Sequence, residues 1–373
     1  MIPRHLLTTA AAALALGAWA TAANAAGKWD GADDLPTNPL ACEAGGAAEV
    51  AAKPYDGGQP TNPPDLAGKE ITIVDVPKLI GIGYFNATSK GIQDAAKELG
   101  NVKAKTDGPT EAKIDEQIKF IDNYITSGVN GILFAANDPV AIAPVLKKAL
   151  SKGIHVIGYD ANSTPDAREW FVNQAEFNGI AKAMIDSMSK EAGDDAAFAI
   201  VTSTFTTPNQ ARWIAEMEAY AAKCHPKMQW LETVEAQEDN NLSFNQATTL
   251  INKHGDKLKG IFGMTSVATP ASAEAVTKAG QCGKIAVVGL ATPNAMKPYV
   301  HSDCVKSVVL WNPIDLGYAA TYVMRAVADG KLKPGDKSVE AGHLGKLNVV
   351  NGSEILLGAP FIFSKDNIDK FDF

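Results

Sequence analysis

Short apolar segments alternate with amphipathic segments from residue 70 onward, and this alternation constrains the fold more than any other feature. The strand-like segments lie at 71–77, 131–136, 155–160, 196–203, 228–236, 260–265, 285–290 and 305–311. Apolar residues at helical spacing mark segments between them, at 91–100, 113–128, 139–153, 179–193, 209–224, 243–255 and 268–280. Strands that are apolar on both faces and alternate with helices indicate a parallel sheet covered on both sides. The units are too many for one sheet of ordinary width, so we predict an α/β protein with two doubly wound parallel-sheet lobes.

The first 25 residues have the pattern of a bacterial secretory signal peptide. Arg4 and His5 form a basic head, residues 6–22 are an apolar run, and Ala23-Asn24-Ala25 is a small-x-small cleavage site. A membrane anchor is the alternative, but the run is shorter than the ~20 apolar residues that a spanning helix needs. Cys42 lies too far beyond the run to take a lipid. We therefore expect a soluble periplasmic protein.

Residues 26–69 are rich in Ala, Gly, Pro and Asp and show no persistent helical or strand period. We expect an irregular N-terminal extension there, because the stretch PYDGGQPTNPPD is rich in turn-forming residues.

The composition excludes several classes of function. The formal charge is −8, and no basic cluster stands out, which counts against nucleic acid and anionic membrane surfaces as partners. Gly81-Ile82-Gly83 follows the first strand, but Asn86 leaves the dinucleotide-binding motif incomplete. The sequence has no Walker A motif, no H-E-x-x-H and no G-x-S-x-G. An exported enzyme stays an alternative because a carboxylate pair can form in space, but we expect no catalytic activity, no cofactor and no metal.

Four cysteines, Cys42, Cys224, Cys282 and Cys304, allow three pairings in an exported chain. Cys282 and Cys304 each stand just before a predicted strand, and neighbouring parallel strands bring their starts together. We favour a Cys282–Cys304 disulfide, which leaves Cys42–Cys224 to tie down the extension. Free buried thiols are the alternative for at least one pair.

Polar residues follow most of the predicted strands. In open parallel sheets, ligands bind beyond the carboxyl ends of the strands. The residues there are mostly amides and hydroxyls, and the aromatic side chains of Tyr84, Phe85, Phe205 and Trp311 lie close by. Uncharged hydrogen-bonding groups beside aromatic faces suit a small polyhydroxylated ligand.

Several motifs resemble one family: VPKLIGIGYF, TDGPTEA, HVIGYD, VGLATPNAMKPYV, LWNPIDLGY and SKDNIDKFDF. They resemble the Lsr-type autoinducer-2-binding proteins and the related rhamnose-binding proteins, which are periplasmic solute-binding proteins of sugar ABC importers with the fold of ribose-binding protein. The resemblance runs from about residue 70 to the end. It implies two lobes joined by three crossovers that close over a ligand by a hinge motion.

On this basis, we expect lobe one to hold residues 70–172 plus 313–345, and lobe two to hold residues 173–311 plus 346–373. The resemblance also implies a monomer that binds a small sugar-like ligand and delivers it to an ABC permease in the inner membrane. A sensory binder that presents its closed form to a chemoreceptor or sensor kinase would have the same fold and site.

The resemblance carries ligand-binding roles onto six positions. Lys78 and Asp160 match the family pattern, with a solvated lysine and a turn cap as the alternative readings. Gln210 matches as well, whereas Asn209 replaces an Asp. Met264 and Ser266 replace a Pro and an Ala. These three departures change hydrogen bonds worth on the order of 1–3 kcal/mol each in a closed site. We therefore favour a neutral monosaccharide or deoxysugar over autoinducer-2.

Four further residues are weaker ligand-binding candidates. Tyr84 and Phe85 follow the first strand, Trp311 ends the last one, and Asn312 lies at a predicted crossover. Core packing is the alternative role for the three aromatic residues. Asn137 and Asp138 are read either as ligand contacts or as caps of the helix that begins near Pro139.

Overall fold

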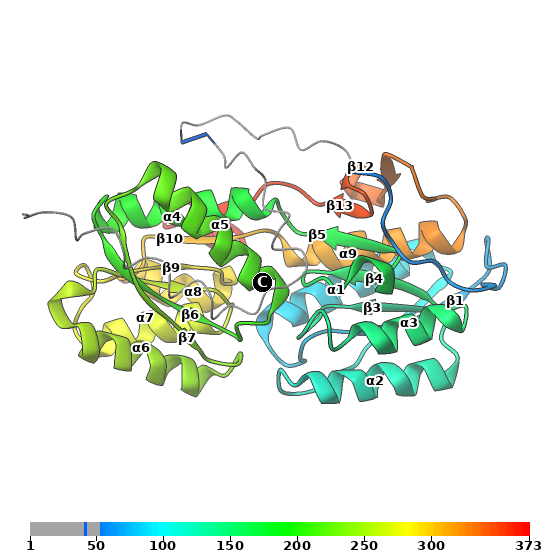
Figure 1. The fold of residues 1–373 in the computed structure, drawn as a ribbon, viewed down its shortest axis with the longest axis horizontal. Helices are drawn as coiled ribbons and strands as arrows, with labels where there is room; N and C mark the ends of the chain where they lie inside the picture. The colour runs from blue at the N-terminus through cyan, green and yellow to red at the C-terminus, as the bar shows by residue number, and fades with distance from the viewer. Residues whose placement is uncertain (1–40, 43–52) are drawn as a thin grey trace, which may run out of the picture.

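The computed structural model describes residues 41–42 and 53–373, which form two α/β lobes side by side (Figure 1). The predicted signal peptide and much of the predicted extension lie outside the described residues. No helix in the described part of the chain is long and apolar enough to cross a membrane.

Lobe one is built on an eight-stranded sheet with the order β11-β12-β13-β5-β4-β3-β1-β2. Strands β1 to β5 are parallel to one another, and β13 continues the parallel pairing beside β5. The strands are β1 (Ile71–Val76), β2 (Val102–Thr106), β3 (Gly131–Phe134), β4 (His155–Tyr159), β5 (Trp170–Asn173), β11 (Ser338–Glu340), β12 (Lys346–Asn351) and β13 (Glu354–Leu356).

Helices cover both faces of this sheet, as its doubly apolar strands require. They are α1 (Gly83–Leu99), α2 (Ile114–Ser127), α3 (Ala143–Ser151) and α9 (Pro313–Ala328), with short 3₁₀ turns η2 (Pro165–Ala167) and η4 (Gly342–Leu344). Ile73 and Leu133 belong to the same apolar cluster as Ile92 of α1. Val74 and Ile132 belong to a second cluster with residues of α2 and α3. Successive side chains along β1 and β3 point to opposite faces of the sheet, so each face has its own apolar core.

Lobe two holds a four-stranded parallel sheet in the order β7-β6-β8-β9. A parallel bridge between Leu290 and Val309 brings β10 beside β9, and β10 pairs antiparallel with β14. The strands are β6 (Ala197–Thr202), β7 (Gln229–Glu235), β8 (Gly260–Gly263), β9 (Ala286–Gly289), β10 (Ser307–Leu310) and β14 (Phe361–Ser364). The helices are α4 (Phe177–Ala192), α5 (Pro208–Cys224), α6 (Asn240–His254), α7 (Ala268–Lys278) and α8 (Pro293–His301), with 3₁₀ turns η3 (Gly255–Lys257) and η5 (Ile368–Lys370).

The chain passes between the lobes after β5, after β10 and after β13. The third passage differs from the expected boundary, which assigned residues 346–373 to lobe two. Residues 346–356 instead extend the first sheet, because β13 pairs with β5 through Ile355 opposite Val172 and Glu354 opposite Phe171. Ile355 is fully buried by this pairing. The short β12–β13 hairpin contains no alternation of helix and strand, so the sequence pattern does not indicate to which lobe it belongs.

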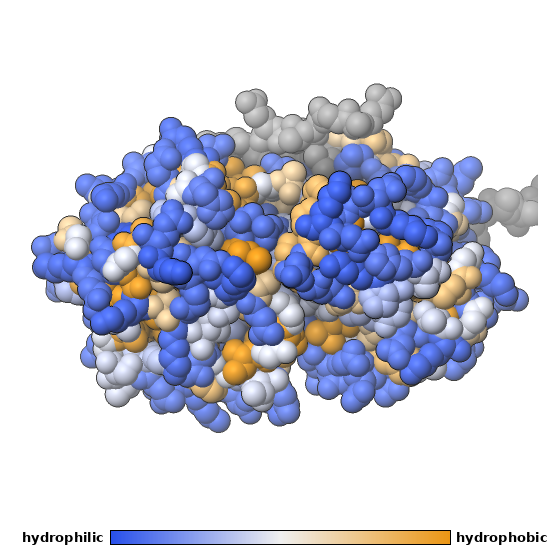
Figure 2. All heavy atoms as spheres, turned by 180° about the vertical axis from the view of Figure 1, so that it is seen from behind, coloured by the Kyte–Doolittle hydropathy of each residue, from blue (hydrophilic) through white to orange (hydrophobic). Residues whose placement is uncertain are grey.

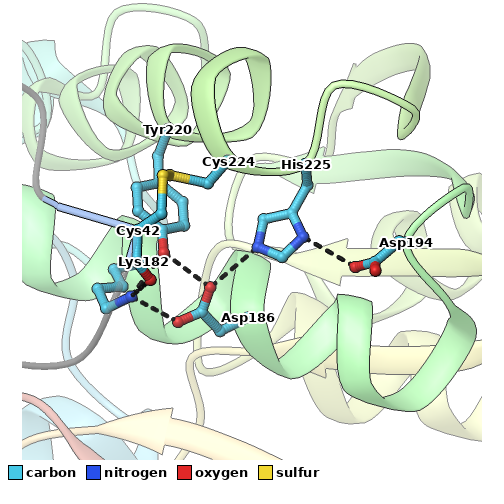
Figure 3. Close-up of a disulfide and its surroundings, with 7 residues drawn as sticks. All are labelled: Cys42, Lys182, Asp186, Asp194, Tyr220, Cys224 and His225. Atoms are coloured by element: carbon cyan, nitrogen blue, oxygen red, sulfur yellow. Dashed lines mark hydrogen bonds and ion pairs between the residues drawn. A yellow bond between two sulfur atoms is a disulfide. The ribbon is translucent and has the colours of Figure 1, made fainter.

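Two disulfides are present, with the pairing that the sequence favoured. Cys282 and Cys304 have Cα atoms 4.7 Å apart, at the loops that lead into the neighbouring strands β9 and β10. Cys42 and Cys224 have Cα atoms 5.4 Å apart, so a covalent bond joins the extension to the end of α5. Beside it, the Lys182 ammonium donates to the Cys42 carbonyl (3.0 Å) and to the Tyr220 hydroxyl (2.6 Å) (Figure 3).

The later part of the extension lies on lobe one. The Tyr55 hydroxyl donates to the Glu169 carbonyl at 2.9 Å, the Thr61 amide donates to the Leu150 carbonyl at 2.8 Å, and Leu66 is buried in the core. The extension is therefore bonded covalently to lobe two and packed non-covalently on lobe one.

Candidate ligand-binding site

A cavity of about 340 Å³, partly open to solvent, lies between the lobes where strands from both sheets end. Its lining residues come from both lobes: Lys78, Ile82, Tyr84, Phe85, Asp160, Asn209, Gln210, Trp213, Glu238, Met264, Thr265, Ser266, Leu290, Leu310 and Trp311. Seen from behind, hydrophilic residues cover most of both lobes, and a notch separates them at the lower edge (Figure 2). Nine of the ten residues predicted to bind ligand line the cavity; Asn312 does not.

Asp160, directly after β4, is the centre of the polar network from lobe one. The residue is 2% exposed and its backbone has a φ of +60°, a left-handed conformation that is uncommon outside glycine. The Tyr84 hydroxyl donates to Oδ1 of Asp160 at 2.9 Å and accepts from Trp311 Nε1 at 2.9 Å. Burial and the neighbouring Asp160 carboxylate hold the pKa of Tyr84 well above its usual range. Tyr84 is therefore a neutral hydrogen-bond donor that orients this carboxylate.

Lys78 joins the two lobes across the cavity. Its ammonium lies 3.2 Å from Asp160 Oδ2 and donates to Asn209 Oδ1 of lobe two at 3.3 Å. Apart from this ion pair, Oδ2 has no hydrogen-bond partner among the described residues, so it keeps capacity for a further donor. Lys78 is 3% exposed, which excludes the solvated-lysine reading.

The segment that carries Lys78 is held by Asn137. The Asn137 side chain donates to the Lys78 carbonyl at 2.8 Å, while Asp138 accepts from the amides of Val140 and Ala141 at 3.0 and 2.8 Å. Asp138 thus caps the turn before α3, and neither Asn137 nor Asp138 lines the cavity.

Asn209 and Gln210 begin α5, where Pro208 occupies the first helical position. Gln210 Oε1 accepts from the Thr202 hydroxyl (2.6 Å) and the Ser203 amide (2.8 Å), and its Nε2 donates to Glu238 Oε1 (3.3 Å). The protein therefore uses much of the hydrogen-bonding capacity of Gln210, which leaves it as a support for Glu238.

The turn after β8 places Met264, Thr265 and Ser266 on the cavity wall. The Thr265 hydroxyl accepts from the amides of Val267 (3.2 Å) and Ala268 (2.8 Å), so it fixes the start of α7. Ser266, the next residue, is half-buried.

Aromatic rings form the other side of the cavity. Tyr84 packs edge-on against Phe85 at 5.2 Å and against Trp311 at 6.0 Å between ring centroids, and Trp213 lies 5.7 Å from Trp311. Trp213 was missed by the sequence analysis, although it lies four residues after Asn209 and so on the same face of α5. Its buried indole Nε1 has no hydrogen-bond partner among the described residues.

Asn312 was expected to bind ligand, but it is the N-cap of α9. Its Oδ1 accepts from the Ile314 amide at 3.0 Å and its Nδ2 donates to Asp315 at 2.8 Å. An Asn directly before Pro313 at the first helical position is a typical capping arrangement, and that local demand uses the side chain.

Glu238 is the second residue that the sequence analysis missed. It follows β7, the one strand of the lobe-two sheet whose end was not considered, and it lines the cavity with 9% exposure. Burial and the nearby Asp160 raise its pKa, while Lys78 opposes that shift. No group of three or more His, Cys, Asp or Glu side chains that could hold a metal ion occurs within residues 41–42 and 53–373.

Residues 73–332 match the family described as periplasmic binding protein domain. The D-allose-binding periplasmic protein of Escherichia coli is 27% identical over 277 residues, which cover 71% of this chain and 87% of the relative. A solute-binding protein of an ABC transporter from Clostridium phytofermentans, solved with bound L-rhamnose, is 28% identical with a TM-score of 0.78, covering 81% of this chain and 98% of that chain. LsrB from Clostridium saccharobutylicum, in complex with AI-2 (autoinducer-2), is 25% identical with a TM-score of 0.77, covering 81% and 100%.

These similarities confirm the resemblance to the Lsr-type and rhamnose-binding group and the two-lobed α/β architecture. The relatives are substrate-binding proteins of transport systems rather than enzymes. With more than two thirds of its length inside the matched region, and with a cavity between two doubly wound lobes, the chain belongs to the periplasmic binding protein family.

Proposed function

We propose that this protein captures a small neutral sugar or sugar-like polyol in the cavity between its lobes and delivers it to an ABC importer. The observation that carries the proposal is the row of buried polar contacts from Asp160 through Lys78 to Asn209, which joins the two lobes at the wall of the cavity. A ligand whose hydroxyls form hydrogen bonds with these three side chains interacts with both lobes at once. Such a ligand stabilises the arrangement in which the lobes are in contact, and so couples binding to shape.

The balance of groups favours a polyol. Asp160 supplies acceptors for hydroxyls, Lys78 and the side-chain amide of Asn209 supply donors, and the Tyr84, Phe85 and Trp311 rings supply apolar faces. The similarity to proteins named for D-allose and solved with L-rhamnose supports the same class of ligand.

Binding of AI-2, for uptake or for sensing through a receptor, is the second candidate. The similarity to LsrB in complex with AI-2 favours it. Against it stand Asn209, Met264 and Ser266, which differ from the pattern of the Lsr-type proteins and which all line the cavity. We propose the neutral sugar as the ligand for this reason.

We further propose that the protein acts in the periplasm as a monomer, with a permease in the inner membrane as its partner. The family of the chain supports this placement, and the sequence pattern of residues 1–25 agrees with export.

A thermal-unfolding screen tests the ligand class. A ligand at a hundredfold excess over its Kd stabilises the folded state by about 2.7 kcal/mol, so binding gives a clear rise in Tm. The panel contains D-allose, D-ribose, L-rhamnose, D-arabinose, D-tagatose, D-fucose and AI-2. We expect one neutral sugar to give the largest shift.

Asp160→Asn should remove most of that ligand-induced shift, because it removes a charge-assisted acceptor worth about 1.5–3 kcal/mol. Asp94→Asn, at an exposed ion pair with Lys90 on α1, is the matched control and should keep the full shift. A full shift in Asp160→Asn would contradict the site, a largest shift with AI-2 would favour the second candidate, and no shift across the panel would contradict the proposed function.

A further inference from the structure

Glu238 is a buried carboxylate that the family motif does not include, and the backbone is bent to place it. Gln237 and Glu238 are consecutive residues with positive φ, +52° and +56°. Such conformations are unfavourable for residues with a side chain and persist where the surrounding structure imposes them. In the described chain only five non-glycine residues have positive φ, and two of them, Asp160 and Glu238, line the cavity.

The bent segment is fixed on both sides of Glu238. The Ala236 and Gln237 amides donate to the carbonyls of Thr202 and Ser203 at 2.8 and 2.9 Å. Asp239 accepts from the Leu242 amide at 2.6 Å as the N-cap of α6. These bonds leave Glu238 directed to the cavity, where Gln210 Nε2 donates to its Oε1 at 3.3 Å.

The charges around the cavity are unbalanced. Among the lining residues of the described chain, Lys78 is the single cation, and it already lies beside Asp160 and donates to Asn209. Glu238 therefore adds a second carboxylate, from lobe two, to a site whose one ammonium is engaged. A carboxylate has about four acceptor positions, and the hydrogen bonds from the Gln210 amide and the Thr265 hydroxyl occupy two of them. Buried acceptors of this kind need donors, and ligand hydroxyls can supply them.

We propose that Glu238 is a ligand-binding residue that accepts a hydrogen bond from a ligand hydroxyl. This inference rests on the proposed function. Together with Asp160 on the opposite lobe, it selects neutral or amino-substituted polyols and excludes anionic ones. A uronate or a sugar phosphate would bring a negative charge between two buried carboxylates, where repulsion is only weakly screened.

The first test extends the panel with D-glucuronate, D-galacturonate, D-ribose 5-phosphate, D-glucosamine and D-galactosamine. Because the site carries an excess of carboxylates, we expect a neutral or amino sugar to give the largest Tm shift with the unmodified protein. An anionic compound giving the largest shift would overturn the inference.

The second test measures the Kd of the best compound by titration calorimetry for the unmodified protein, Glu238→Gln and Glu238→Asp. Glu238→Gln should weaken binding by about tenfold to a hundredfold, the loss expected for a charge-assisted hydrogen bond. The Tm of its ligand-free form should not fall, because the amide removes a buried charge but keeps the shape. Glu238→Asp keeps the charge but withdraws it by one methylene, so it should weaken binding too, and it serves if the amide variant does not fold.

Glu235→Gln is the matched control. Glu235 ends the same strand and accepts from the Phe205 amide at 2.6 Å, but it does not line the cavity. Its variant should bind with unchanged Kd. An unchanged Kd in Glu238→Gln, with or without a lower Tm, would give Glu238 a structural role only and overturn the inference while the proposed function stands. Absence of binding by the unmodified protein to every compound would overturn both.

Discussion

At the scale of single residues, burial decides what each ionisable group does. Asp75 of β1 is fully buried between two strands, where it accepts from the Tyr159 hydroxyl (2.9 Å) and the Thr106 hydroxyl (3.0 Å). Burial raises the pKa of Asp75 to about 7 despite these two bonds. Asp160, the residue directly after Tyr159, is also buried but has Lys78 beside it. The first carboxyl supports the sheet, whereas the second is paired with Lys78 and keeps capacity for a further donor at the cavity.

Asp75→Asn should change the pH dependence of stability. The folded pKa of Asp75 lies above its unfolded value of about 3.9, so its contribution to stability is fully present below pH 4 and is lost as pH rises toward 7. The full loss is on the order of 4 kcal/mol. The amide variant does not titrate, so its free energy of unfolding relative to the unmodified protein should increase between pH 5 and pH 8.

Urea unfolding at both pH values measures this difference. A parallel change in the two proteins from pH 5 to pH 8 would mean that Asp75 does not titrate in this range. The isosteric amide keeps an acceptor for one hydroxyl and a donor toward the other, so the comparison is made between proteins of the same shape.

At the scale of elements, one helix pair connects the core of lobe one to the cavity. Helices α1 and α9 approach so closely that a Cβ on Gly317 would lie 2.0 Å from the Thr88 carbonyl, and one on Gly91 would lie 1.8 Å from the Ile314 carbonyl. Helix α1 carries Tyr84, and α9 begins two residues after Trp311, whose indole donates to that tyrosine. The two glycines therefore hold together two elements that place the aromatic side of the cavity.

Gly317→Ala should destabilise the fold by about 1–3 kcal/mol, because the added methyl group forces the two helix backbones apart. Ligand binding should weaken in parallel, since the Tyr84–Trp311 bond depends on the same packing. Gly179→Ala, in α4, is the control, because its new Cβ would meet atoms no closer than 3.5 Å. Urea unfolding of the two variants compares them, and equal free energies of unfolding would contradict the packing argument.

At the scale of the whole molecule, the extension connects the lobes outside the three chain crossings. Residues 53–69 pack on lobe one through Tyr55, Thr61 and Leu66, whereas Cys42 is bonded to Cys224 of lobe two. This disulfide spans a sequence separation of 182 residues, against 22 for Cys282–Cys304. It therefore stabilises the protein mainly by restricting the conformational freedom of the unfolded chain over about half the length of the protein.

Replacing both Cys42 and Cys224 by Ser should cost more stability than replacing Cys282 and Cys304. Loop-closure entropy grows with the logarithm of loop length, which predicts losses of roughly 5 kcal/mol for the long loop and roughly 3 kcal/mol for the short one. Urea unfolding of the two double variants gives both values. A larger loss for the Cys282–Cys304 pair would show that native-state contacts, rather than loop length, determine the contribution of these disulfides.

The sequence by itself determined the layered α/β class and most of the positions around the cavity. Alternation of doubly apolar strands with helices admits few other folds. The rule that ligands bind at strand ends selected the segments around the cavity, and the family resemblance assigned ligand-binding roles to Lys78, Asp160 and Asn209 within them. Each of these residues lies next to an element whose end is visible in the local pattern.

Only the tertiary structure decided which strand ends meet and which side chains are used elsewhere. Asn312 stands at a strand end like the others, but it caps α9, and the β12–β13 hairpin joins the first sheet by pairing with a strand about 180 residues earlier. Glu238 reaches the cavity because Gln237 and Glu238 both have a left-handed backbone conformation, which no local sequence pattern predicts. The physical reason is common to all three. Strand pairing, helix capping and backbone bending depend on residues that only folding brings near, whereas apolar periodicity depends on residues that are neighbours in the sequence.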